Sequence, residues 1–358
     1  MSEENSGGIG SGTLNRRLFV KTALISGAAL TSALPAHVLL AAGKAPQTIR
    51  VGFFLETKPT MIAKGEKWFD KLAGAPIAWT EAGAGAEINT AMAARSLDIG
   101  LAIGSSPTAA GISQKLPYEL IGMVDNIGPA EDMVVRKAAN IRKPADFKGK
   151  KVATPFGSTS HFRLLGFLKV NNLTEKDVTV LDLKPDAEVA AWERGDIDAA
   201  YVWSPAKAKM LAAGGQSFPT YKELDAKGYV IADLIVAGTE FSKTYPDAVT
   251  GFLHAYGNAL NLWKTKPNDA AAIVAKQAGV TPDVAKHDME EYDFVTFERQ
   301  LSADWLGPPG KPGKFAEVLK RTADFLVQQK SIRSAPDLAA FQKAINTTFL
   351  AQAAKAKA

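Results

Sequence analysis

The stretch EVAAWERGDIDAAYVWSP, residues 188–205, carries the pattern of an α/β unit. It opens with an amphipathic helical turn, passes a break at Arg-Gly-Asp (194–196) and continues as the apolar run Ala199–Trp203. Ser204-Pro205 then begins a new element, because proline is favoured in the first turn of a helix. We therefore expect a helix, a glycine turn, a buried strand and a second helix in this order.

An earlier stretch, ARSLDIGLAIGSSP at residues 94–107, repeats this pattern. An apolar strand is expected at Ile99–Ile103, and Gly-Ser-Ser-Pro (104–107) opens the helix after it. Two such units predict two α/β lobes, each with hydroxyls and backbone N–H groups at the mouth of a helix. Helix mouths of this kind bind anions.

The rest of the chain fits the same fold class. Strands alternate with helices from Ile49–Leu55 to Tyr229–Val236, which predicts mainly parallel sheets. From Phe241 onward the pattern is mostly helical. We therefore expect an α/β protein with two lobes and a helical C-terminal part.

Composition limits the function. A chain of 358 residues with 46% hydrophobic and 22% charged residues is typical of a soluble protein with two domains. The net charge of +5 is spread along the chain, so we expect no nucleic-acid partner. The chain has no cysteine, which excludes disulfides, thiol catalysis and Cys-ligated zinc.

The N-terminus resembles a twin-arginine export signal. NRRLFVK at 15–21 is followed by a weakly apolar run at 22–34 and by small residues at 41–45. A membrane anchor is the alternative, but the apolar run is too short and too diluted to span a bilayer. We expect residues 1–42 to be cleaved and the mature chain to reach the periplasm.

Motifs for catalysis are missing. The four histidines are scattered, and neither a metalloprotease motif nor a nucleophile elbow is present. The glycine pair at 83–85 lacks the third glycine of a dinucleotide site, because Ile88 stands there. GPPGKPG at 307–313 is no Walker loop, since Phe315 stands where a hydroxyl is needed. We expect no enzyme, no cofactor and no metal.

Several sequence segments resemble segments of one protein family and occur in the same order along the chain. They are GSSP at 104–107, VVRK at 134–137, KPADFKGK at 143–150, VATPFGSTSH at 152–161 and AWERGDIDAAYVWSP at 191–205. The chain resembles the taurine-type periplasmic substrate-binding proteins of ABC importers, which are close to the aliphatic-sulfonate and nitrate binders. The likeness covers nearly the whole mature chain.

The resemblance implies the type II periplasmic binding protein fold. Lobe 1 would comprise residues 46–133 plus 238–358, and lobe 2 residues 137–234. Two hinge strands would join them, near Met133–Lys137 and near Leu234–Gly238.

The resemblance also implies capture without chemistry. A monomer would close around taurine or another sulfonate and then dock on a permease driven by a separate ATPase subunit. Two alternatives stay open: a binder of a different ligand, such as an alkanesulfonate, nitrate or a pyrimidine, and a thiamine-pyrimidine synthase-like enzyme of the same fold. Such synthases carry a cysteine cluster, which this chain lacks.

A sulfonate stays anionic at any cellular pH, so it needs donors such as helix N-termini and hydroxyls. Asp233 matches the acid that the family uses for the amine of taurine, and Glu56 is a second candidate acid. The candidate ligand-binding residues are Glu56, Thr57, Gly85, Ser105, Ser106, Ser158, Thr159, Ser160, Trp203 and Asp233.

Each candidate has a structural alternative. The hydroxyl residues favour helix N-caps in any case, and Trp203 fits an ordinary core position. A buried Asp233 is equally explained by a lysine or arginine partner. Glu87 departs from the family pattern: it is either a capping-box acid or a charge in the cleft that repels a sulfonate.

Overall fold

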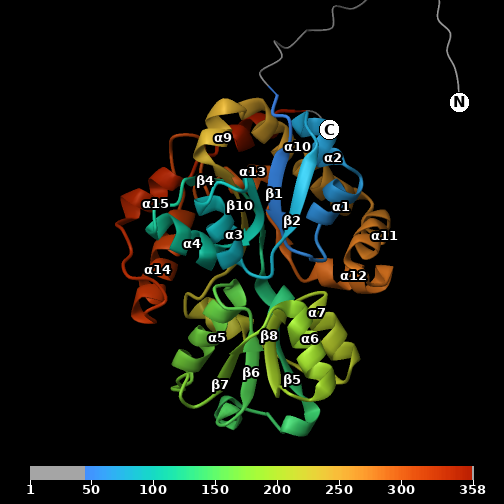
Figure 1. Ribbon diagram of the computed structural model, residues 1–358, viewed down its shortest axis with the longest axis vertical. Helices are drawn as coiled ribbons and strands as arrows, with labels where there is room; N and C mark the ends of the chain where they lie inside the picture. The colour runs from blue at the N-terminus through green and yellow to red at the C-terminus, as the bar shows by residue number, and fades with distance from the viewer. Residues whose placement is uncertain (1–44, 357–358) are drawn as a thin grey trace, which may run out of the picture. The chain divides into compact units, whose positions relative to one another are not determined.

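Each of the two expected α/β units folds around its own sheet in the computed structural model, which describes residues 45–356 (Figure 1). The expected export signal at 1–42 lies outside these residues. Residues 42–358 group into one compact unit. Within the described part of the chain, no helix has both the length and the apolar character required to cross a bilayer.

The first sheet has the strand order β11-β4-β10-β3-β1-β2, and we call its surroundings lobe 1 (45–126 and 232–356). Its strands are β1 (Ile49–Phe53), β2 (Ile77–Glu81), β3 (Ile99–Gly104), β4 (Tyr118–Asn126), β10 (Ala232–Gly238) and β11 (Asp293–Phe294). Its helices are α1 (Thr60–Gly65), α2 (Trp68–Ala73), α3 (Gly85–Ala93), α4 (Ser105–Ser113), α9 (Thr239–Thr244), α10 (Pro246–Thr265), α11 (Pro267–Ala278), α12 (Pro282–Glu290), α13 (Phe297–Gln300), α14 (Phe315–Gln328), α15 (Leu338–Ala344) and α16 (Thr348–Ala353).

The second sheet has the order β7-β6-β8-β5-β9, and we call its surroundings lobe 2 (131–228). Its strands are β5 (Glu131–Arg136), β6 (Lys151–Thr154), β7 (Thr179–Asp182), β8 (Ala199–Trp203) and β9 (Gly215–Phe218). Its helices are α5 (Thr159–Val170), α6 (Pro185–Arg194), α7 (Ala206–Ala212) and α8 (Tyr221–Ala226). Strands β3 and β8, the two apolar runs that defined the units, are buried along their whole length. Apolar side chains on both faces of a strand require cover on both faces, and helices provide it.

The α/β class is confirmed, but both sheets are mixed rather than mainly parallel. β1 pairs in parallel with β2 and β3, whereas β10 runs antiparallel between β3 and β4. β6 pairs in parallel with β7 and β8, whereas β5 runs antiparallel between β8 and β9. A strand that follows a helical crossover within one lobe runs parallel to the strand before it. Strands β5 and β10 enter their sheets from the other lobe instead, and they run antiparallel to their neighbours.

The crossings between the lobes lie slightly earlier than we expected. Met133–Lys137 and Leu234–Gly238 belong almost wholly to β5 and β10, so they are sheet strands and not connections. The chain crosses instead at 127–130 and at 229–231, where Ile127 N donates a 3.2 Å hydrogen bond to Ile231 O. The glycine and proline at 128–129 end β4 here, because Gly128 has a φ of +57°.

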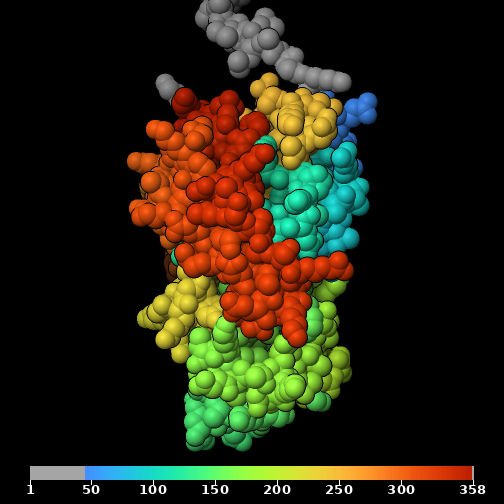
Figure 2. Space-filling model, turned by 90° about the vertical axis from the view of Figure 1, so that its left-hand side faces the viewer, coloured from blue at the N-terminus to red at the C-terminus, as the bar shows by residue number. Residues whose placement is uncertain are grey.

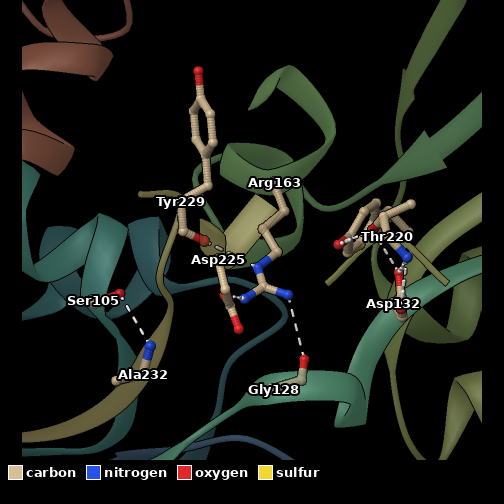
Figure 3. A network of polar contacts seen from close by, with 9 residues as sticks. Ser105, Gly128, Asp132, Arg163, Thr220, Asp225, Tyr229 and Ala232 are labelled. Carbon is tan, nitrogen blue, oxygen red and sulfur yellow. Dashed lines mark hydrogen bonds and ion pairs between the residues drawn. The ribbon is translucent and has the colours of Figure 1, made fainter. Parts of the chain in front are cut away.

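Arg163 on α5 binds both crossings (Figure 3). Its fully buried guanidinium donates from Nη1 to Gly128 O at 3.3 Å and from Nε to Tyr229 O at 3.3 Å. It also pairs with Asp225 at the end of α8. One lobe 2 side chain therefore fixes both connecting segments relative to α5.

Helix α14 of lobe 1 reaches across the junction and covers part of lobe 2 (Figure 2). Its Phe325 ring packs edge-on against Phe162 at 5.3 Å and against Tyr229 at 5.0 Å. At the end of α14, Gln328 Oε1 accepts a 2.8 Å hydrogen bond from Lys169 Nζ.

Candidate ligand-binding site at the junction of the lobes

Three helices begin at the junction: α3 and α4 in lobe 1 and α5 in lobe 2. The amides of a first helical turn have no partner inside the helix and lie at the positive end of its dipole. Glycines let these mouths approach closely. A Cβ on Gly85 would lie 2.2 Å from Pro107 Cγ, and one on Gly104 would lie 2.5 Å from Thr159 Cγ2.

Between the mouths lies a small cavity of about 20 Å³. Three of its lining side chains are carboxyls, from Glu56, Glu131 and Asp233. Thr159 Oγ1 donates a 2.7 Å hydrogen bond to Glu131 Oε2, whereas Glu131 Oε1 and Glu56 Oε2 have no hydrogen-bond partner among the described residues. The other lining residues are Phe54, Gly85, Ala102, Gly104, Pro107, Ser158, Thr159 and Trp203.

Behind two of these carboxyls lies a buried lysine. Lys58 follows β1, and its side chain is 1% exposed. Its Nζ lies 3.2 Å from Glu56 Oε1 and 3.1 Å from Asp125 Oδ2, and it donates a hydrogen bond to Asp233 Oδ2. The same Nζ lies 4.4 Å from the centroid of the Tyr292 ring. The ends of β1 and β4 and the start of β10 thus surround one ammonium group.

Burial controls the charges in this cluster. It raises the pKa of Glu56 well above its usual range and that of Asp125 to about 8, against the opposing effect of Lys58. Burial also raises the pKa of Glu131 to about 7. Burial alone would lower the pKa of Lys58, but its three carboxyl neighbours outweigh burial and hold that pKa above its usual value. The lysine therefore stays charged while part of the carboxyl set is protonated near neutral pH.

An outer cavity of about 360 Å³ adjoins the inner one and shares Phe54 and Trp203 with it. These two rings, one from each lobe, meet edge to face at 6.2 Å. Lys184 and Lys209 are among the charged side chains that line the outer cavity. Glu81 and Asp186 line it too, so the formal charges of the outer cavity balance.

Comparison with known proteins assigns the chain to a family. The model of the NMT1/THI5 like family matches residues 56–270. The chain belongs to the NMT1/THI5-like family. It is 31% identical over 291 residues to the taurine-binding periplasmic protein of Escherichia coli K12, across 79% of this chain and 87% of that protein. The resemblance found in the sequence is thereby confirmed.

Solved structures share the fold of this NMT1/THI5-like chain. The alkanesulfonate-binding protein of Xanthomonas axonopodis pv. citri, solved with bound MOPS, has a TM-score of 0.71 at 22% identity, over 85% of this chain and 99% of that one. The periplasmic aliphatic sulphonate binding protein of Escherichia coli has a TM-score of 0.65 at 22% identity, over 83% and 92%.

Most of the candidate residues meet at the inner cavity of this NMT1/THI5-like fold. Ser106 lies at its edge and donates a 3.0 Å hydrogen bond to Ser158 O across the lobes. Ser158 Oγ caps α5 by accepting from His161 N, so the capping alternative holds for its side chain. The candidates that line the cavity are Glu56, Gly85, Ser158, Thr159, Trp203 and Asp233.

Four candidates have surroundings that differ from our expectation. Ser105 Oγ is buried and accepts a 3.2 Å hydrogen bond from Ala232 N, which ties α4 to β10. Thr57 and Ser160 are fully buried and lie outside the cavity lining. Asp233 pairs with Lys58, which is the internal partner that we gave as the alternative to a ligand amine. The sequence alone did not show this lysine to be within reach.

Glu87 faces the rim and not the inner cavity. Its Oε2 accepts a 3.1 Å hydrogen bond from Gly83 N, and its Oε1 lies 2.7 Å from Lys184 Nζ of lobe 2. Its charge is therefore matched by a lobe 2 cation, and it does not repel an anion held between the helix mouths.

Sequence reasoning missed the buried charges of the NMT1/THI5-like site. Lys58 and Asp125 stand at or just after the end of an apolar run, and Glu131 stands shortly before one, which is a weak signal for a site at strand ends. Their meeting depends on the strand order, which places β10 beside β4 and β3.

The described residues offer no other chemistry at the junction. In 45–356, no group of three or more His, Asp or Glu side chains is arranged to hold a metal ion. His161 stacks on Phe156 at 4.3 Å, and burial lowers its pKa to about 4, so it is neutral at physiological pH.

Proposed function

We propose that this protein is the solute-binding component of an ABC importer and captures taurine or a related sulfonate in the periplasm. The observation that carries the proposal is the inner cavity, where helix mouths from both lobes converge with the hydroxyls of Ser158 and Thr159. A relative 31% identical over most of both chains is a taurine-binding periplasmic protein.

An anion held there gains donors from two lobes at once. First-turn amides of α3, which begins at Gly85, belong to lobe 1 and those of α5 to lobe 2. An anion can contact both lobes at once only when the lobes are closed. Binding therefore shifts the equilibrium between the open and closed forms toward the closed form. We assign the hinge to the two crossings at 127–130 and 229–231, which Arg163 holds together.

The remaining steps of the proposal concern transport. The mature chain follows an export signal of the twin-arginine type, acts as a monomer and delivers its ligand to a membrane permease driven by a separate ATPase. No bond of the ligand changes during this cycle.

A thermal-shift screen tests the ligand class. The mature chain, starting near Ala45, is melted with taurine, ethanesulfonate, nitrate, a pyrimidine and glycine in separate samples. At about 100 times the dissociation constant, a bound ligand stabilises the fold by roughly 2.7 kcal/mol, which raises the melting temperature by several degrees. We expect this rise with a sulfonate. A rise with nitrate or the pyrimidine alone would contradict the proposal.

A further inference from the structure

The ammonium of Lys58 is held as proteins hold a bound primary amine. It contacts one oxygen from each of three carboxyls, Glu56, Asp125 and Asp233, and it lies over the face of an aromatic ring. Asp233 accepts a hydrogen bond from this ammonium, Glu56 and Asp125 form ion pairs with it, and the ring adds a cation–π contact. The described chain thus contains an ammonium site that its own lysine fills.

This site needs its cation. Asp125 is fully buried, and neither of its carboxyl oxygens has a hydrogen-bond partner among the described residues, so the ion pair with Lys58 is its main compensation. Removing one partner of a buried pair leaves a costly unpaired charge. The cation at this place therefore compensates a buried carboxyl group and is not an incidental contact.

The same carboxyls form part of the inner cavity wall. Glu56 and Asp233 line the cavity, whereas Lys58 does not and lies behind them. A ligand that brought an amine into the cavity would compete with Lys58 for these two acids. The lysine is tethered only two residues from Glu56, so its local concentration far exceeds that of any free ligand.

We propose that Lys58 is a specificity-determining residue: it occupies the ammonium site of the cleft, so the cleft takes sulfonates without an amine in preference to aminoalkanesulfonates. This inference rests on the proposed function and narrows it from sulfonates in general to amine-free ones. Burial raises the pKa of Glu131 to about 7, which lowers its repulsion of a sulfonate near neutral pH.

The first experiment uses the unaltered mature chain. Isothermal titration calorimetry compares taurine with isethionate and ethanesulfonate, which keep the two-carbon sulfonate and replace the amine by a hydroxyl or a hydrogen. Because Lys58 already engages Glu56 Oε1 and Asp233 Oδ2, a ligand ammonium would have to compete with it for these acids, and we expect taurine to bind at least about tenfold more weakly than isethionate. Taurine binding as tightly as isethionate, or more tightly, would overturn the inference.

The second experiment empties the site. In Lys58→Ala the carboxyls are left without their cation. The ratio of the affinity for taurine to the affinity for isethionate should therefore rise by about tenfold or more. Methylammonium should raise the melting temperature of this variant and leave that of the unaltered chain unchanged, while tetramethylammonium, which has no N–H donor, should not. An unchanged preference, or no difference between the two cations, would contradict the inference.

A matched control is Lys207→Ala. Lys207 is also a buried lysine near the junction and pairs with Glu291 at 2.5 Å, but it lies outside the inner cavity lining. This change should lower the affinities for taurine and isethionate equally and show no effect of methylammonium on the melting temperature.

If the unaltered chain binds no sulfonate, the proposed function fails, but the methylammonium comparison still tests the cation site. If Lys58→Ala does not fold, the comparison of ligands on the unaltered chain decides alone.

Discussion

The Ser106 hydroxyl on α4 donates a 3.0 Å hydrogen bond to the carbonyl oxygen of Ser158 at the start of α5. Ser106 belongs to lobe 1 and Ser158 to lobe 2, so the two helix mouths are joined directly across the junction. The contact lies beside the cavity that we assign to the anion. The mouth of α5 therefore takes part both in this cross-lobe contact and in the lining of the cavity.

Replacement of Ser106 by alanine should weaken closure without harming the fold. The change removes one cross-lobe hydrogen bond, worth about 0.5–1.5 kcal/mol, so sulfonate affinity should fall by roughly 2–10-fold. Calorimetry gives the affinity, and small-angle scattering gives the fraction of closed molecules. Ser113→Ala on the same helix, where the hydroxyl binds only Ala109 O within α4, is the control and should have no effect. An unchanged affinity in Ser106→Ala would remove this contact from the closure mechanism.

The rim pair between Glu87 and Lys184 should contribute little. Both side chains are largely in solvent, with exposed fractions of 42% and 63%. Exposed ion pairs are weak and screened by salt, so Lys184→Met should lower sulfonate affinity less than about threefold, and the difference should vanish at high ionic strength. Affinity titrations at low and high salt measure it. A large, salt-independent loss would mean that Lys184 contacts the ligand itself.

Arg163 should be a major stabilising residue of the hinge. Its buried guanidinium satisfies two carbonyl oxygens of the crossings and pairs with Asp225, which is partly exposed. Arg163→Met should therefore lower the free energy of unfolding by about 2–4 kcal/mol, measured by urea denaturation. Arg299→Met, which breaks the exposed pair with Asp293, is the comparison and should cost less than about 1 kcal/mol. Equal losses in the two variants would contradict the hinge role.

Stability should fall as pH rises because of Glu131. Burial is the main reason why its pKa is raised from 4.5 to about 7, and Asp233 adds to the rise. The folded state therefore binds more protons than the unfolded state between these values. Its stabilising contribution is full below pH 4.5 and is lost as the pH rises through about 7. Urea denaturation from pH 5 to pH 8 should show this fall, and Glu131→Gln should make the profile flatter. An equally steep profile in the variant would assign the effect to other groups.

The sequence predicted the fold best where every residue of a strand is buried. The apolar runs that became β3 and β8 predicted two α/β units, because each strand needs cover on both faces. Glycine and hydroxyl residues ahead of expected helices predicted helix mouths, and Gly85, Ser158 and Thr159 do line one cavity. Local pattern and packing agree at these positions.

The partners of buried charges depend on contacts that local pattern does not contain. Lys58 and Asp233 are separated by 175 positions in the chain and meet only because β10 crosses back into the first sheet. The same crossing explains the mixed sheets and the shifted hinge segments. A pairing that depends on strand order cannot be read from either residue's neighbours.

A crystal structure of the mature chain with ethanesulfonate would locate the bound anion. We predict that the sulfonate oxygens accept hydrogen bonds from first-turn amides of α3 and α5, with the alkyl chain toward Phe54 and Trp203. We also predict that Lys58 keeps its three carboxyl partners. A sulfonate bound away from these helix mouths, or one paired directly with a displaced Lys58, would contradict the account.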